Sequence, residues 1–274
     1  MHGLGNDFAV FDARNQTLAL DAATARAIAD RRFGIGCDQV IVIEPATNGA
    51  DAFMRIYNSD GGEVESCGNA ARCIARVLMD EKNANGITLD TKGGPLACTA
   101  HGALVTIDMG VPKFGWREIP MARETDTLSF PIEIDGSDFY PLTIATAVNV
   151  GNPHVVLFVQ DAEHAPVSEL GPKIEHHPLF PERTNVEFIS LTDKNRLRMR
   201  VWERGAGITM ACGTGACAAM VAATRRGLVG HKVDVVLDGG TLTIEWAGDG
   251  KPVLMTGPWA RAYRGEIDLA ALTP

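Results

Sequence analysis

The strongest constraint on this chain is an internal repeat. The segment Met54-Arg55-Ile56-Tyr57 returns 145 residues later as Met199-Arg200-Val201-Trp202, and Cys67-Gly68 returns with the same spacing as Cys212-Gly213. Two shorter matches have a spacing of 146 residues: Gly5-Asn6 recurs as Gly151-Asn152, and Gly93-Gly94 recurs as Gly239-Gly240. A shared spacing along most of the chain indicates a tandem duplication, and two copies indicate a pseudo-two-fold pair of domains rather than a solenoid.

The local patterns agree with two similar domains, and 274 residues is a length that suits two. Apolar, β-branched runs predict strands, among them 40–43, 104–107, 142–148, 154–158 and 233–237. Helical patterns are fewer and cover 22–32, 68–82, 167–176 and 213–226. Runs of strands with about two helices per half predict an α+β fold, in which each domain is a curved, mostly antiparallel β-sheet wrapped on a helix.

The predicted domains are 1–112 and 113–257, joined by a linker at 113–124, and the tail 258–274 is expected to return to the first domain. The second half has an apolar strand before Gly151-Asn152, whereas the counterpart of that strand would precede Met1. Because an unpaired sheet edge is a liability, we expect a further strand upstream of this sequence.

Composition excludes several classes of function. Hydrophobic residues make up 46% of the chain and charged residues 22%, which is typical of a globular protein. A net charge of −9 argues against nucleic acid or an anionic membrane as partner. The uncharged stretch 205–224 is rich in glycine and small residues, which disfavours a membrane helix. Six cysteines are too few for a disulfide scaffold, and no secretion signal opens the chain, so we expect a cytoplasmic protein.

Each copy has a cysteine-glycine pair at the start of a helix of small residues, at Cys67 and at Cys212. The positive end of a helix dipole lowers the pKa of a thiol at the N-terminus and favours the thiolate. The next backbone N–H groups, at Gly68-Asn69 and Gly213-Thr214, suit an anion such as a carboxylate. Each half therefore offers one acid or base beside one anion cradle.

Other interpretations of the cysteines remain open. A lone cysteine is usually a small buried side chain, and this interpretation applies to Cys37, Cys73, Cys98 and Cys217. The spacings C-x5-C and C-x4-C are not those of usual zinc ligands. A redox protein could form a reversible disulfide between Cys67 and Cys212, and an amino-acid-binding module would need no catalysis. A single-cysteine hydrolase would not need the matched second loop.

Two equivalent thiols suit the inversion of a stereocentre. If the two domains face each other, one carbon can lose a proton to one thiol and regain a proton from the other. The sequence has no dinucleotide-binding glycine motif after a strand, no P-loop and no lysine in either loop as an evident pyridoxal anchor. It therefore predicts racemisation or epimerisation without a cofactor or metal.

At these residues the chain resembles the diaminopimelate epimerase family, over nearly its whole length. The matching segments are His2-Gly3-Leu4-Gly5-Asn6-Asp7-Phe8, Gly36-Cys37-Asp38-Gln39, Asn58-Ser59-Asp60-Gly61, Cys67-Gly68-Asn69-Ala70-Ala71-Arg72, Gly151-Asn152-Pro153-His154, Thr184-Asn185-Val186-Glu187, Glu203-Arg204-Gly205 and Ala211-Cys212-Gly213-Thr214-Gly215. The Cys-Gly-Asn-Ala-x-Arg form of the first loop separates it from proline racemase and the phenazine-type isomerases, which share the architecture.

The resemblance implies interconversion of LL- and meso-diaminopimelate, a step toward lysine and peptidoglycan, with Cys67 and Cys212 exchanging roles as thiolate base and thiol acid. It implies that His154 and Glu203 assist thiol ionisation. The implied substrate contacts are Asn6, Gln39, Asn58, Gly68, Asn69, Asn152, Asn185, Glu203, Arg204, Gly213 and Thr214. The resemblance also implies a homodimer with Tyr263 at its interface. Taken alone, a histidine such as His154 is more often structural than catalytic, and an asparagine that follows a glycine is more often a turn residue than a ligand.

Overall fold

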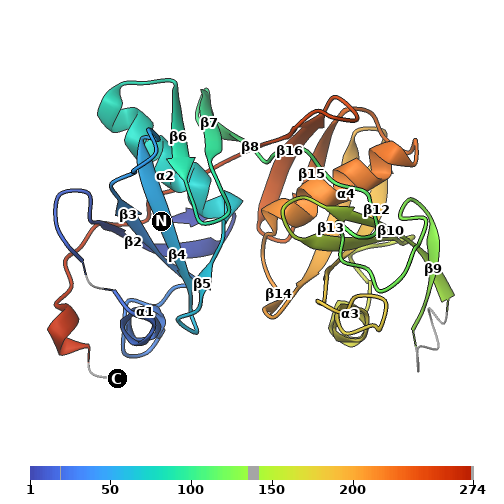
Figure 1. The fold of residues 1–274 in the computed structure, drawn as a ribbon, viewed down its shortest axis with the longest axis horizontal. Helices are drawn as coiled ribbons and strands as arrows, with labels where there is room; N and C mark the ends of the chain where they lie inside the picture. Colours follow the sequence, from blue (N-terminus) through green and yellow to red (C-terminus); the bar gives the residue numbers. More distant parts are fainter. Residues whose placement is uncertain (19, 135–141, 273–274) are drawn as a thin grey trace. The chain divides into compact units, whose positions relative to one another are not determined.

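The computed structural model describes residues 1–18, 20–134 and 142–272 (Figure 1). The chain divides into two compact units: Met1–Asp108 together with Thr256–Pro274, and Met109–Met255. The segment 113–124, expected to be a linker, lies in the second unit, where Lys113 forms a β-bridge with Asn149. The last two residues of the expected tail, 273–274, lie outside the described residues.

The first unit contains strands, two α-helices and a short terminal 3-10 turn. Its elements are β1 (His2–Gly3), β2 (Asn6–Asp12), α1 (Ala22–Ala29), β3 (Gln39–Glu44), β4 (Ala52–Asn58), β5 (Glu63–Val64), α2 (Gly68–Lys82), β6 (Gly86–Asp90), β7 (Leu96–His101), β8 (Leu104–Asp108) and η1 (Leu269–Ala271).

The second unit has the same kinds of element in the same order. They are β9 (Phe130–Glu133), β10 (Leu142–Asn149), β11 (Pro153–Phe158), α3 (Val167–Glu175), β12 (Asn185–Asp193), β13 (Arg196–Glu203), β14 (Gly207–Ile208), α4 (Gly213–Arg225), β15 (Lys232–Leu237) and β16 (Gly240–Trp246). A last strand, β17 (Val253–Gly257), runs across the boundary from the second unit into the first.

Strand pairing repeats between the units. In the first, β2 and β3 pair in parallel with α1 between them, and β4 and β6 pair in parallel with α2 between them. In the second, β11 and β12 enclose α3 and β13 and β15 enclose α4 in the same way. Three antiparallel pairings of the first unit, β3–β4, β4–β5 and β6–β7, correspond to β12–β13, β13–β14 and β15–β16 of the second. The mixed, mainly antiparallel sheet agrees with the predicted fold class.

The registers identify equivalent positions in the two units. Phe8 pairs with Gln39 in the first, and His154 pairs with Asn185 in the second. Two residues further along β3 and β12 lie Ile41 and Glu187, which are therefore equivalent too. By the same comparison Val40 faces Tyr57 as Val186 faces Trp202, so Asn58 at the end of β4 corresponds to Glu203 at the end of β13.

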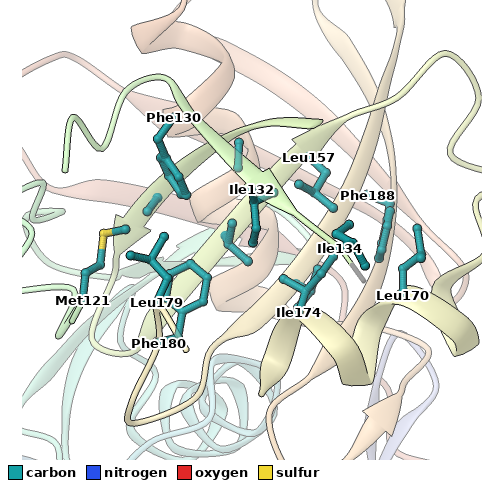
Figure 2. Close-up of a cluster of buried hydrophobic side chains, with 14 of the residues drawn as sticks. Met121, Phe130, Ile132, Ile134, Leu157, Leu170, Ile174, Leu179, Phe180 and Phe188 are labelled. Atoms are coloured by element: carbon teal, nitrogen blue, oxygen red, sulfur yellow. The ribbon is translucent and has the colours of Figure 1, made fainter. Parts of the chain in front are cut away.

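A buried helix fills each sheet. The helix α2 packs on β6, β7 and β8, and α4 packs on β10, β11, β12, β13 and β16. In α4 every residue from Gly215 to Ala223 is buried, which its glycine and alanine content permits because small side chains allow close approach to strands. The helix α3 contributes Leu170 and Ile174 to a second apolar cluster, which also contains Phe130, Ile132 and Phe188 (Figure 2).

Helix ends differ slightly from the sequence prediction. The helix α1 stops at Ala29, before the expected residue 32, because Asp30 takes an extended backbone and its carboxylate accepts the N–H groups of Arg32 and Phe33. The other three helices begin at the predicted residue and end at or one residue before the predicted one. Among residues 1–18, 20–134 and 142–272, no helix combines the length and apolar character needed to cross a membrane.

Candidate functional site

Cys67 is the N-cap of α2, directly after the turn that follows β5. Its thiol is half-buried and lies 3.9 Å from Oδ1 of Asn6. The same Asn6 oxygen accepts a hydrogen bond of 3.3 Å from Nδ2 of Asn69 in the first turn of the helix. Asn6, Cys67 and Asn69, three residues predicted from the sequence, therefore lie together in the first unit.

The amide of Asn6 is oriented by its neighbours. Its Nδ2 donates to Oδ2 of Asp38 at 2.9 Å, and Arg31 bonds both Asp38, at 2.9 Å, and Asp7, at 2.8 Å. Although burial acts in the opposite direction, the hydrogen bonds from Arg31 hold the pKa of Asp7 below its ordinary value. Asp38 thus directs the amide nitrogen of Asn6 away from Cys67 and the oxygen toward it.

Gln39 and Asn58 form a second polar pair in the first unit, at the facing ends of β3 and β4. Nε2 of Gln39 donates to Oδ1 of Asn58 at 2.9 Å. Within the described part of the chain, the buried Oε1 of Gln39 has no hydrogen-bond partner. A buried acceptor of this kind is suited to a donor from a ligand, such as an ammonium group.

Cys212 is the N-cap of α4, and its sulfur accepts the N–H of Gly215 at 3.3 Å and lies 3.5 Å from the hydroxyl of Thr214. The side chain is buried, with 3% of the residue exposed. Burial, followed by the nearby carboxylates of Glu203 and Glu187, raises the pKa of Cys212 well above its ordinary value. The prediction that the helix dipole would lower this pKa is therefore wrong for Cys212, because desolvation and two negative neighbours outweigh the dipole.

His154 belongs to a polar network with Asn152 and Glu187, and Glu187 lies near Cys212. Its Nδ1 is 2.7 Å from Oε1 of Glu187, and its Nε2 is 2.8 Å from Oδ1 of Asn152. Both His154 and Glu187 are 0% exposed. Burial raises the pKa of Glu187, while the adjacent imidazole acts in the opposite direction.

Glu203 is the last residue of β13, and Arg204 follows it in the turn after the strand. The hydroxyl of Thr209 donates a short hydrogen bond to Oε1 of Glu203. The side chain of Arg204 is exposed, and its guanidinium donates to the carbonyl of Glu182 at 3.2 Å. An exposed guanidinium held by one backbone carbonyl keeps most of its donors available for an anion.

Asn185 has a more structural setting than the sequence suggested. It is 3% exposed, its Nδ2 donates to the carbonyl of Pro153 and its Oδ1 accepts the N–H of Arg204, each at 2.9 Å. The amide therefore ties the start of β11 to the backbone of Arg204.

The helix starts provide backbone donors in both units. Ala71 donates its N–H to the carbonyl of Cys67 at 2.9 Å, and Ala216 donates to Cys212 at 3.0 Å. The first turn of any α-helix leaves its amides without an intrahelical acceptor. Those amides belong to Gly68, Asn69, Gly213 and Thr214, the four positions predicted to bind a carboxylate.

The remaining cysteines, Cys37, Cys73, Cys98 and Cys217, are all buried, and burial raises the pKa of Cys73 to about 11 and of Cys98 to about 12. Tyr263 is 67% exposed. The described residues contain no group of three or more His, Cys, Asp or Glu side chains arranged to hold a metal ion.

Sequence reasoning assigned no role to Glu187 or Asp38, although both lie in segments that carried the family resemblance. A signal for Glu187 was present, because a carboxylate interrupts the apolar run of β12, whose residues from Asn185 to Ser190 are all buried. For Asp38 the comparable signal was its position immediately before Gln39.

Comparison with known proteins gives a consistent result. A family profile described as diaminopimelate epimerase matches residues 1–115 and 146–261. A protein named diaminopimelate epimerase from Erythrobacter litoralis is 54% identical over 98% of this chain and 96% of its own length. One of the same name from Acidiphilium cryptum is 50% identical over 100% of this chain and 97% of its own.

Among solved structures, a hydroxyproline epimerase from Agrobacterium vitis matches with a TM-score of 0.64 at 18% identity, covering 94% of this chain and 87% of that one. At that identity the likeness concerns the fold alone, and it agrees with the α+β architecture described above.

Proposed function

Because this chain belongs to the diaminopimelate epimerase family, we propose that it interconverts LL- and meso-diaminopimelate by means of two cysteines and without a cofactor. The single observation that carries the proposal is that a cysteine is the helix N-cap at equivalent positions of both units. Each unit has a cysteine at the start of a buried helix, followed by the backbone amides of the first helical turn, a position suited to a carboxylate. The reaction would serve the formation of lysine and of peptidoglycan precursors.

The proposed chemistry is a proton abstraction followed by a proton return. One cysteine, as thiolate, removes the proton from the α-carbon, and the other, as thiol, gives a proton to the opposite face of the resulting carbanion. The first thiolate becomes a thiol and the second thiol becomes a thiolate, so the reverse reaction uses them in exchanged roles. Backbone amides at the two helix starts stabilise the negative charge that develops on the substrate carboxylate.

The surroundings of Cys212 suit the acid role. Burial and the two carboxylates favour its neutral, protonated form. A thiol kept protonated in the free enzyme has a proton to donate, so we assign Cys212 the role of acid and Cys67 the role of base in the first half-reaction. Glu203, at the end of β13, then accepts the proton when Cys212 must ionise for the reverse direction.

The polar side chains are proposed to hold the rest of a zwitterionic substrate. Arg204 would bind the distal carboxylate, because a guanidinium matches a carboxylate with two parallel hydrogen bonds. The free Oε1 of Gln39 would accept from an ammonium group. Asn6, Asn58 and Asn152 would complete the contacts, whereas Asn185 would act by holding the backbone of Arg204.

The proposal is tested by a stereoisomer assay of the purified protein with LL-diaminopimelate, in the presence and absence of reductant. We expect meso product to form and activity to be highest when both thiols are fully reduced. Absence of epimerisation by the fully reduced protein would contradict the proposal and leave the redox protein with a reversible Cys67–Cys212 disulfide as the alternative. Tight binding of diaminopimelate with no turnover would support the amino-acid-binding module.

A homodimer in the cytoplasm is part of the same proposal and rests on the family resemblance. Tyr263 would lie at the subunit interface, and its high exposure in the single chain leaves it accessible for such a contact. Sedimentation at several concentrations measures the molecular mass, and a species of 29.3 kDa at all of them would contradict the dimer.

A further inference from the structure

The buried pair formed by His154 and Glu187 is the feature of the second unit that its fold explains least. Both side chains are fully buried, and Oε2 of Glu187 has no hydrogen-bond partner among the described residues. A buried ionisable pair loses hydration that its mutual attraction only partly replaces, so apolar residues of similar volume are usually as stable or more stable. Stability alone therefore does not account for this pair.

The first unit shows that the fold does not require the pair. The positions equivalent to His154 and Glu187 are Phe8, 4% exposed, and Ile41, 0% exposed, so the same strands are held there by apolar packing. The same fold is therefore stable with apolar residues at these two positions. We conclude that the ionisable pair has a functional role that is specific to the second unit.

The helix that packs beside the pair, α4, also differs from its equivalent α2, at a residue that lies close to Glu187. A Cβ atom on Gly215 would lie 2.9 Å from Oε1 of Glu187 and 3.2 Å from the sulfur of Cys212. The equivalent residue of α2, 145 positions earlier, is Ala70, and in that unit Ile41 occupies the position of Glu187. Glycine at 215 thus makes room for the carboxylate next to the cysteine.

We propose that Glu187 is a positioning residue, which holds His154 through Nδ1 so that its Nε2–H points at Asn152. This assignment rests on the proposed epimerase function, which gives His154 and Asn152 their roles. Glu187 itself has no contact with substrate in this account and acts only through the imidazole that it holds.

The two ring contacts show what the carboxylate would contribute. In the proposed arrangement Nδ1–H donates to Oε1 of Glu187 across 2.7 Å, and Nε2–H donates to Oδ1 of Asn152 across 2.8 Å. With Oδ1 of Asn152 facing the imidazole, its Nδ2 is the other end of the amide and can donate to a ligand. This orientation suits a carboxylate at that position better than an ammonium group.

The test compares Glu187→Gln with the wild type and with Glu245→Gln, which removes an exposed carboxylate paired with Lys232. We expect Glu187→Gln to lower kcat by about 10- to 100-fold with KM changed by less than about 3-fold, as for residues that orient a catalytic group. Glu245→Gln should leave both constants unchanged. Equal kcat in Glu187→Gln and the wild type would overturn the proposal.

A second readout does not depend on activity. A proton held between Nδ1 and a buried carboxylate exchanges slowly and resonates far downfield in the proton NMR spectrum. We expect this signal in the wild type and in Glu245→Gln, and we expect its loss in Glu187→Gln. If the wild type does not convert diaminopimelate but the signal behaves in this way, the proposed function fails while the positioning of His154 stands.

Replacing the pair by the equivalent residues of the first unit distinguishes a role in positioning His154 from a role in folding. The double variant His154→Phe/Glu187→Ile should fold with a Tm equal to or above that of the wild type and should lack epimerase activity and the downfield signal. A double variant that does not fold would contradict the claim that the pair serves function rather than the stability of the fold.

Discussion

At the scale of single residues, the two cysteines have the same place in the fold but different electrostatic surroundings. Cys212 lies near Glu187 and Glu203, whereas the equivalent positions in the first unit are occupied by Ile41 and Asn58, which carry no charge. A carboxylate near a thiol disfavours the thiolate. The duplication has therefore produced an acid-like site and a less charged one from the same scaffold.

This difference predicts how stability depends on pH. Because the folded state raises the pKa of Cys212 above the ordinary value of 9.0, the unfolded chain loses this proton first and the folded state binds more protons at alkaline pH. The contribution is fully present below about pH 9 and is lost as pH rises above it, by up to about 1.4 kcal/mol per pH unit for one group. We expect the free energy of unfolding of Cys212→Ala to fall less steeply between about pH 8 and pH 10 than that of the wild type. Identical slopes in denaturant titrations would contradict this.

Asp38 provides a second residue-scale prediction. Its carboxylate holds Nδ2 of Asn6, whose oxygen faces Cys67, so Asp38→Asn should let the Asn6 amide turn and should lower kcat/KM by about 10-fold. The Arg31–Asp38 ion pair is largely exposed, so its loss should change stability by less than about 1 kcal/mol. Asp161→Asn, which removes an exposed carboxylate beside His164, is the matched control. A fall in kcat/KM only in proportion to lost folded protein would count against the positioning of Asn6.

At the scale of elements, the fit between α3 and β13 sets the position of the Glu203 end of the strand. A Cβ on Gly171 would lie 2.5 Å from Cγ of Trp202, the residue before Glu203, and the indole donates to the buried Glu175 at 2.7 Å. Only the absence of a side chain at 171 lets the helix approach this closely.

We therefore expect Gly171→Ala to destabilise the protein by about 1–3 kcal/mol, because the helix must move or the indole must shift. Gly86→Ala is a suitable control, because a Cβ there would meet nothing closer than 3.5 Å. Thermal denaturation of both variants measures the difference. Equal Tm values of the two variants would contradict this prediction, because they would mean that the α3–β13 contact accommodates a Cβ atom at residue 171 without loss of stability.

The elements also show how far the sequence alone could lead. Small residues after each cysteine and a repeat spacing of 145 residues were enough to place α2 and α4 and the donors at their starts. The end of α1 was missed because it depends on the extended backbone of Asp30, for which the apolar pattern has no signal. The raised pKa of Cys212 could not be foreseen, since it depends on burial and on carboxylates that only the strand registers bring to the helix.

At the scale of the whole molecule, the chain returns at its end to the unit in which it began. Ala260 exchanges two backbone hydrogen bonds of 2.9 Å with His2, and the carbonyl of Pro258 accepts from Nε of the buried Arg72 at 3.1 Å. Arg72 also donates to Oδ1 of Asn69, which follows the Cys67 cap by two residues. The terminal segment is thereby linked to the first cysteine site.

Deleting residues 258–274 should consequently affect both folding and activity. The deletion removes a carbonyl acceptor from a fully buried guanidinium, which costs about 1–3 kcal/mol or more for a charged group. We expect a lower Tm and a loss of turnover greater than the loss of folded protein. Deleting only 264–274, which keeps both Pro258 and Ala260, should retain more activity, and equal activity of the two truncated proteins would contradict this role.

The central claim, that two thiols act on opposite faces of one carbon, is tested most directly by running the reaction in deuterated water and stopping it early. The account predicts that the meso product carries one deuterium at the inverted carbon, that unreacted LL substrate carries none, and that Cys67→Ala and Cys212→Ala each form no product. Undiminished epimerisation by either variant, or product that retains the original proton, would contradict it.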